Sequence, residues 1–321
     1  MKVIADPQLK QFAEEHHLVG LTSPSLRALV TEKAGYSVDK ARRFLAFQRR
    51  IDNELLRHRI ITNNRYTAWF KQGGQSFAQV RAFIVQFSVF SNQFLVAQLN
   101  KMINADSLQG MRASKEILAN EIGVVFNAGR TAAPASKDLD PEGGDPEWVS
   151  TEGSVEGGVF RFRAAHFEWL LQIAERLGLG FDEVGKRKHG TPATLHFCDE
   201  LNWLYGSEDY AISQAASYAV ENWAAAGFWQ ELIEGFSRYN TRTGSGLPLA
   251  FFTWHNRLEA QHAQHTQEEL EELYLMRNID EDAFIQHGNE MLDGVAVFWD
   301  GLEQQRLMIA ADEGDSTPIV A

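Results

Sequence analysis

The sequence predicts an all-α protein that folds as a single packed helical bundle. The long segments place their apolar residues at helical spacing, proline is scarce, with 8 residues in 321, and no strand pattern of useful length appears. The hydrophobic content of 44% is ordinary for a globular protein and is sufficient for a sizeable core.

The first part of the chain is expected to be helical from residue 7 to residue 126. Ser23 suits the N-cap of a helix that has Pro24 at its first position. A strongly amphipathic helix follows and ends before Gly73 and Gly74. The next helix is rich in phenylalanine, which indicates a buried central helix, although the same stripe could line an apolar substrate. The predicted helical segments are 7–35 (one or two short helices), 37–63, 76–104 and 108–126.

Residues 127–159 have a different character, because they are rich in glycine, proline, serine and acidic side chains. A segment of this length exceeds ordinary connections, so it is functional, a lid over the active site, or disordered. Helical patterns resume after it, and we therefore interpret it as an insertion within one domain. The predicted organisation is a helical arm (1–40), one domain with the inserted loop (41–310), and a flexible tail (311–321).

The second part of the chain returns to helical patterns. Gly178 ends the first of these helices, and the polar, glycine-containing stretch 239–246 forms a turn between two later ones. The predicted helical segments are 160–177, 191–205, 210–239, 251–272 and 280–310.

Charge and composition exclude several classes of protein. The formal net charge is −13 and no basic block stands out, so nucleic acid is not an expected partner. A single cysteine, Cys198, excludes an intramolecular disulfide framework and fits a reducing compartment. No signal-peptide pattern and no run of about 18 apolar residues appears, so we expect a cytoplasmic protein without a membrane span.

The segment 251–272 carries the most informative motif. His255, Glu259 and His262 have offsets of four and seven residues, which puts them on one helical face within an arc of about 60°. Two imidazoles and a carboxylate arranged in this way can hold a first-row transition metal. The alternative is a solvated helix face, which is the plain interpretation of the glutamate-rich sequence that follows.

Other segments place single ligand-type residues among apolar neighbours. Glu121 precedes an apolar run, and Glu221 lies among small residues with no lysine or arginine three or four positions away along the chain. A buried carboxylate needs a cationic partner or a metal, so both are candidate ligands. His166 shares a face with Leu170 and is either a hydrogen-bonded core histidine or a further ligand. The group His196, Asp199 and Glu200 is interpreted as a set of mutually bonded or solvated side chains.

These motifs resemble those of the haem-oxygenase-like di-iron oxidases and oxygenases, whose fold is similar to that of TenA and PqqC. The resemblance covers about residues 45–305 and depends on the sequences HNRLEAQH and HFEWL, with the weaker signals NEIG and YAVENW. It departs from the family in two respects. The first glutamate and the first histidine lie 45 residues apart, at 121 and 166, instead of about seven, and Glu259 stands where aspartate is frequent.

The resemblance implies a haem-oxygenase-like bundle with extra N-terminal helices, two iron ions, and O2 as cosubstrate. The reaction would be N-oxygenation or oxidative cleavage of a small organic substrate such as an amino acid, an amine or a fatty acid. A homodimer is expected, with the N-terminal arm as a candidate dimerisation element, and an external electron donor is a further candidate partner. The implied metal ligands are Glu121, His166, Glu221, His255, Glu259 and His262.

Two other hypotheses stay open at this point. One is a metal-free TenA-like or PqqC-like enzyme, which would need a reactive thiol or a cofactor pocket. Cys198 is the only thiol, and His196, two residues away, points to a different helical face. The other is a helical interaction protein with incidental histidines. Among cationic side chains, Arg81, Arg112 and Arg163 are candidates to hold a substrate carboxylate.

Overall fold

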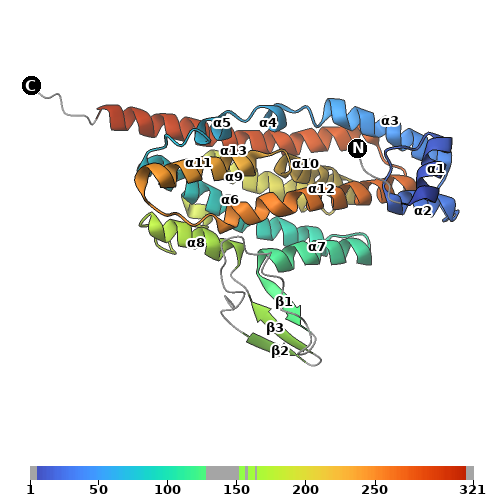
Figure 1. Ribbon diagram of the computed structural model, residues 1–321, viewed down its shortest axis with the longest axis horizontal. Coiled ribbons are helices and arrows are strands. Elements are labelled where there is room, and N and C mark those ends of the chain that lie inside the picture. Colours follow the sequence, from blue (N-terminus) through green and yellow to red (C-terminus); the bar gives the residue numbers. More distant parts are fainter. Residues whose placement is uncertain (1–5, 128–151, 156–157, 163–164, 316–321) are drawn as a thin grey trace, which may run out of the picture.

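The computed structural model describes residues 6–127, 152–155, 158–162 and 165–315 (Figure 1). Side chains are described over these ranges except on the strands and at some helical positions, including residues 258–265. The helices are α1 (Pro7–His16), α2 (Ser23–Val30), α3 (Val38–Glu54), α4 (Arg59–Thr62), α5 (Arg65–Phe70), α6 (Phe77–Ile103), α7 (Leu108–Glu121), α8 (His166–Arg176), η2 (Arg187–His189), α9 (Pro192–Glu200), η3 (Leu201–Tyr205), α10 (Tyr210–Ala224), α11 (Phe228–Thr243), α12 (Ala250–Met276) and α13 (Glu281–Asp315). The strands are β1 (Val124–Asn127), β2 (Glu152–Val155) and β3 (Gly158–Phe162).

The helices form one bundle, which confirms the all-α prediction. The long helix α13 runs along one side, α7 and α8 lie along the opposite side, and α6, α9, α10 and α12 lie between them (Figure 1). Helices α1 and α2 close one end of the bundle. The sheet projects away from the bundle beside α7 and α8, so the additional strands do not alter its helical core.

An aromatic core holds the long helices together. Phe83 and Phe87 on α6 are completely buried, and Phe236, Phe252 and Trp299 bring in α11, α12 and α13. The ring centroids of Phe83 and Phe87 are 5.2 Å apart, and those of Phe236 and Phe252 are 4.8 Å apart, within the range of favourable ring contacts. The prediction of a buried, phenylalanine-rich helix is therefore confirmed over the middle of α6.

The N-terminal end of α6 departs from that prediction. Phe77 is 53% exposed, because it is the first residue of the helix, next to the Ser76 cap and outside the bundle. By length and composition α6 would also pass as a membrane span, but half of its most apolar window is buried inside the bundle. The central helix of a soluble protein has the same properties.

Several predicted helical segments are shorter than the sequence pattern suggested or are interrupted, and 37–63 is divided into α3 and α4. The segment 210–239 is broken by Gly227, whose φ of 101° separates α10 from α11. The segment 108–126 ends at Glu121, where Gly123 has a φ of 71° and the chain continues into β1. Glycine adopts such angles without the steric cost that a side chain would bring. The helix predicted from residue 160 begins at His166, because residues 158–162 form β3.

The insertion leaves and re-enters the bundle through paired strands, although no strand was expected. β1 pairs antiparallel with β3, with Val124 opposite Phe162, and β2 pairs with the other edge of β3. This pairing brings the end of α7 close to the start of α8 despite the long insertion between them. The predicted loop 127–159 lies largely outside the described residues, and so does its suggested role as a lid.

A buried carboxylate attaches the N-terminal arm to the bundle. Glu271 on α12 is completely buried and accepts hydrogen bonds from the backbone N–H of Thr22, at 2.9 Å, and from the Thr22 hydroxyl. Thr22 is the N-cap residue of α2, where a negative charge is favourable because of the helix dipole. Gln267 donates a further bond to the same carboxylate at 3.2 Å.

Replacing Glu271 by alanine is expected to loosen α1 and α2. The change leaves the buried N–H and hydroxyl of Thr22 without their acceptor, which would lower the free energy of unfolding by about 2–4 kcal/mol. Hydrogen exchange of residues 7–30 and urea unfolding measure the effect. Glu272→Ala is the matched control, because Glu272 is the next residue on α12 and its ion pair with Lys33 joins two side chains that are both more than 40% exposed. Unchanged exchange in Glu271→Ala would show that apolar contacts alone hold the arm.

Candidate metal centre

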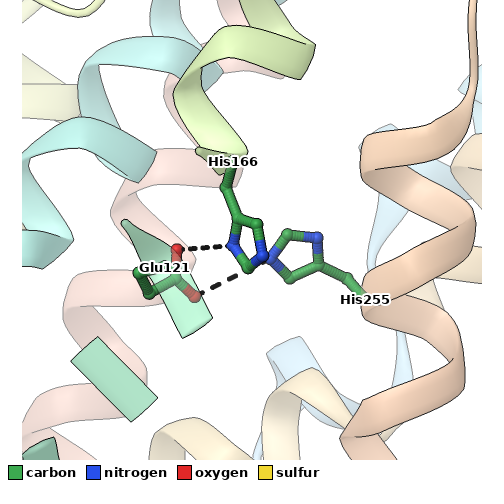
Figure 2. Close-up of side chains that lie close together, drawn as sticks. All are labelled: Glu121, His166 and His255. Atoms are coloured by element: carbon green, nitrogen blue, oxygen red, sulfur yellow. Dashed lines mark hydrogen bonds and ion pairs between the residues drawn. The ribbon is translucent and has the colours of Figure 1, made fainter. Parts of the chain in front are cut away.

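Three side chains from distant parts of the sequence meet at one point inside the bundle (Figure 2). Glu121 is the last residue of α7, His166 is the first residue of α8, and His255 lies in the N-terminal half of α12. Nδ1 of His166 is 2.7 Å from Oε2 of Glu121, and Nε2 of His255 is 3.9 Å from Oε1 of the same carboxylate. One potential ligand atom from each residue lies within 4.8 Å of the other two.

Local structure explains why Glu121 and His166 face each other. The strand pair β1–β3 brings the chain back next to the point where it left α7. Helix α8 then begins directly at His166, and the Glu168 carboxylate accepts a hydrogen bond from the Ala165 backbone N–H at its start. The 45 intervening residues therefore do not separate the two side chains in space.

The orientation of His255 is set by its own helix. Nδ1 of His255 lies 2.6 Å from the carbonyl oxygen of Phe251, one turn earlier. Because a carbonyl oxygen only accepts hydrogen bonds, Nδ1 must carry the proton in this contact. Nε2 is the atom that faces Glu121, and in the neutral ring it would be the nitrogen available to a metal. Histidines that bind metals are commonly held by a bond of this kind from the other ring nitrogen.

Aromatic side chains surround the two histidines. His166 and His255 are 3% and 9% exposed. Trp229 stacks on the His255 ring with a centroid separation of 4.7 Å, and the rings of Trp254 and Trp169 lie 4.5 and 5.3 Å from that of His166. The sequence analysis did not single out these tryptophans, although Trp169 and Trp254 lie close to the histidines along the chain.

Of the other predicted ligands, the structure describes the side chain of Glu221 but not those of Glu259 and His262. Glu221 on α10 is buried, with 6% exposure. Burial raises the pKa of Tyr205 well above its usual range, and the charges of Glu221, Glu269 and Glu121 raise it further. Glu221 and Glu121 are therefore within electrostatic reach of the same phenol. Glu259 and His262 belong to helix α12, but their side chains lie outside the described part of the structure.

The residues around Cys198 do not form a second centre. His196 is exposed, as expected for a solvated group, whereas Asp199 forms an ion pair at 2.8 Å with Arg187, which lies outside the predicted group. Cys198 is completely buried, and burial raises the pKa of its thiol to about 12. The thiolate is the reactive form of cysteine, so this side chain is inert near neutral pH.

Comparisons with known proteins bear on the fold. None of the protein-family models and none of the curated proteins matches the chain. Among solved structures, a domain of unknown function with a haem oxygenase-like fold from Shewanella denitrificans matches with a TM-score of 0.52 and 15% identity, over 81% of this chain and 92% of that one. A CADD-like protein of unknown function from Nostoc punctiforme matches with a TM-score of 0.51 and 16% identity, over 84% and 99%. The chain has the haem-oxygenase-like fold that its sequence motifs predicted.

Proposed function

We propose that this protein is a non-haem di-iron, O2-dependent oxidase or oxygenase that acts on a small organic substrate. The observation that carries the proposal is the convergence of two buried histidines, His166 and His255, on Glu121, whose side chain is 12% exposed. One carboxylate and two imidazoles form a donor set that suits ferrous iron. Aggregating three such groups away from water has no evident structural benefit, since apolar residues would pack there at lower cost.

The distances between these groups fit a metal ion after a small adjustment. A metal–nitrogen or metal–oxygen bond of about 2.1 Å puts two ligands of one ion at most about 4.2 Å apart. The three atoms lie within 4.8 Å of one another, so a closure of less than about 1 Å would bring them onto one ion. The hydrogen bond between His166 and Glu121 would be exchanged for two bonds to the metal.

The remaining predicted ligands would hold the second ion. Glu221 is buried on α10, which packs against α12. Its negative charge raises the pKa of Tyr205, as the charge of Glu121 also does. Glu259 and His262 follow His255 on α12 by one and two helical turns. The proposed set is thus one Glu–His pair from α7 and α8, one carboxylate from α10, and three groups from α12.

Iron bound at this centre would supply the activation of O2 and the oxidation of an amino acid, an amine or a fatty acid. The chain's own groups hold and shield the centre. The Phe251 carbonyl keeps His255 in the tautomer that presents Nε2, and Trp229 and Trp254 exclude water from the imidazole faces. The carboxylates of Glu121 and Glu221 offset positive charge. An external electron donor and a homodimeric assembly belong to the same proposal.

The structure weighs against a thiol-dependent mechanism and against a passive interaction protein. A metal-free thiol mechanism would depend on Cys198, whose buried thiol has a strongly raised pKa. A passive interaction protein would carry its histidines on a solvated face, whereas His166 and His255 are buried and oriented toward one carboxylate.

Anaerobic reconstitution with ferrous iron tests the proposal. We expect about two iron ions per chain and consumption of O2 when the loaded protein is exposed to air. Glu221→Ala and His262→Ala are expected to abolish iron-dependent O2 consumption without changing the helical circular-dichroism signal. A chain that binds no iron, or that keeps its O2 consumption in both variants, would refute the assignment.

A further inference from the structure

Lys101 is a buried cation near the end of α6. Lys101 is 7% exposed, and no other lysine or arginine whose burial the structure describes is buried to this degree. Its Nζ donates a hydrogen bond to the Ser217 hydroxyl and lies 4.8 Å from the centre of the Tyr205 ring. Within the described part of the chain, no carboxylate oxygen lies within 4.0 Å of it.

A buried ammonium group calls for hydrogen-bond acceptors. Removing an unpaired charge from water is costly, and a contact with an aromatic ring offsets only part of that cost. An ammonium group has three N–H donors, of which Ser217 uses one. The hydrogen bonds of the described residues leave two of these donors without an acceptor.

The surroundings of Lys101 connect it to the candidate metal centre. Ser217 precedes Glu221 by four residues on α10, so both side chains lie on one face of that helix. Tyr205 donates a hydrogen bond to Gln98 at 2.6 Å, and Gln98 donates to the backbone carbonyl of Ser114 on α7 at 3.0 Å. Ser114 precedes Glu121 by seven residues, which again places the two on one helical face.

We propose that Lys101 binds the carboxylate of the substrate and thereby orients that substrate at the metal centre. This assignment rests on the proposed function for the reaction, but it specifies the substrate class as a small organic acid. A carboxylate has two oxygens that match the two remaining N–H donors, and a single negative charge that neutralises the ammonium. A phosphate dianion would leave an excess negative charge near Glu121 and Glu221, which is unfavourable in the interior of the bundle.

The arginines considered from the sequence are less suitable for this role. Arg81 is half exposed and lies 3.9 Å from Glu183, and Arg112 is exposed on α7. Arg163 lies outside the described residues. Lys101 has no distinctive sequence signal, because its burial depends on how α6, η3 and α10 pack together.

Ligand-induced thermal stabilisation of the iron-loaded protein tests the assignment. The probes are sodium salts of straight-chain acids from butyrate to dodecanoate, each compared with the neutral amide of the same chain. At least one acid should raise the melting temperature of the wild-type protein while its amide does not. In Lys101→Met, affinity for that acid should fall about thirtyfold or more, as expected when one member of a buried charge pair is removed.

Lys115→Met is the matched control, because Lys115 is an exposed lysine on α7 and should leave binding unchanged. Equal responses to acid and amide in the wild-type protein would overturn the assignment even if Lys101→Met failed to fold, and so would the absence of any response. Equal affinity of Lys101→Met for the acid would also overturn it. Iron content reports separately on the proposed function: an acid-specific response without bound iron would refute the di-iron proposal alone.

Discussion

A His255→Gln variant is expected to lose the iron that the wild-type protein binds, with an affinity lower by more than about 100-fold. Glutamine has nearly the volume of histidine, so the space between Trp229 and Phe251 stays filled. It lacks the imidazole nitrogen, Nε2, that the contact between Nδ1 and the Phe251 carbonyl now directs toward Glu121. Iron content after anaerobic reconstitution and O2 consumption on exposure to air measure the loss.

His196→Gln provides the control for this experiment. His196 is exposed on α9, away from the candidate ligands, and its replacement should change neither iron content nor O2 consumption. In urea unfolding, the free energy of unfolding of both variants should equal that of the wild-type protein to within about 1 kcal/mol. If His255→Gln bound iron as tightly as the wild-type protein, His255 would not be a ligand, and Glu121 and His166 would need another partner.

The part of this site that could be predicted from sequence is the part with a local signal. Glu121 and His166 stand at positions where a charged or polar group has to be compensated, and His255 belongs to a helical repeat of ligand-type residues. Those signals made each residue a candidate, and the resemblance to the di-iron family placed Glu121 and His166, 45 positions apart, at one site. The structure shows the physical reason, which is that antiparallel strands close the insertion onto itself.

The parts that could not be predicted depend on packing between distant segments. Residues 124–126 continue an apolar run, and this run was extended as helix although Val124 and Val125 are β-branched and follow Gly123. The burial of Lys101 and the stacking of Trp229 on His255 require helices that are far apart in sequence to meet. Periodicity describes one helix at a time, so it contains no information about these contacts.

A second large effect is expected at Gly235, where α11 crosses the end of α5. A Cβ atom at this position would lie 2.4 Å from the carbonyl oxygen of Phe70 and 2.5 Å from its ring. That carbonyl cannot easily move, because it accepts hydrogen bonds from the Gly73 backbone N–H and from the Gln75 side chain. The Phe70 ring is also confined, with its centroid 4.8 Å from that of Phe236.

Gly235→Ala should therefore lower the free energy of unfolding by about 1–3 kcal/mol, and Gly235→Val should lower it further and reduce the yield of folded protein. Urea unfolding followed by circular dichroism measures both changes. Gly314→Ala is the control, because Gly314 lies on α13 with no atom within 4 Å of an added Cβ, and alanine there should be neutral or stabilising by up to about 1 kcal/mol. If Gly235→Ala unfolded at the wild-type urea concentration, α11 and α5 would have to separate at little energetic cost. In that case the buried contacts between Phe70, Phe83 and Phe236 would contribute less to stability than their burial indicates.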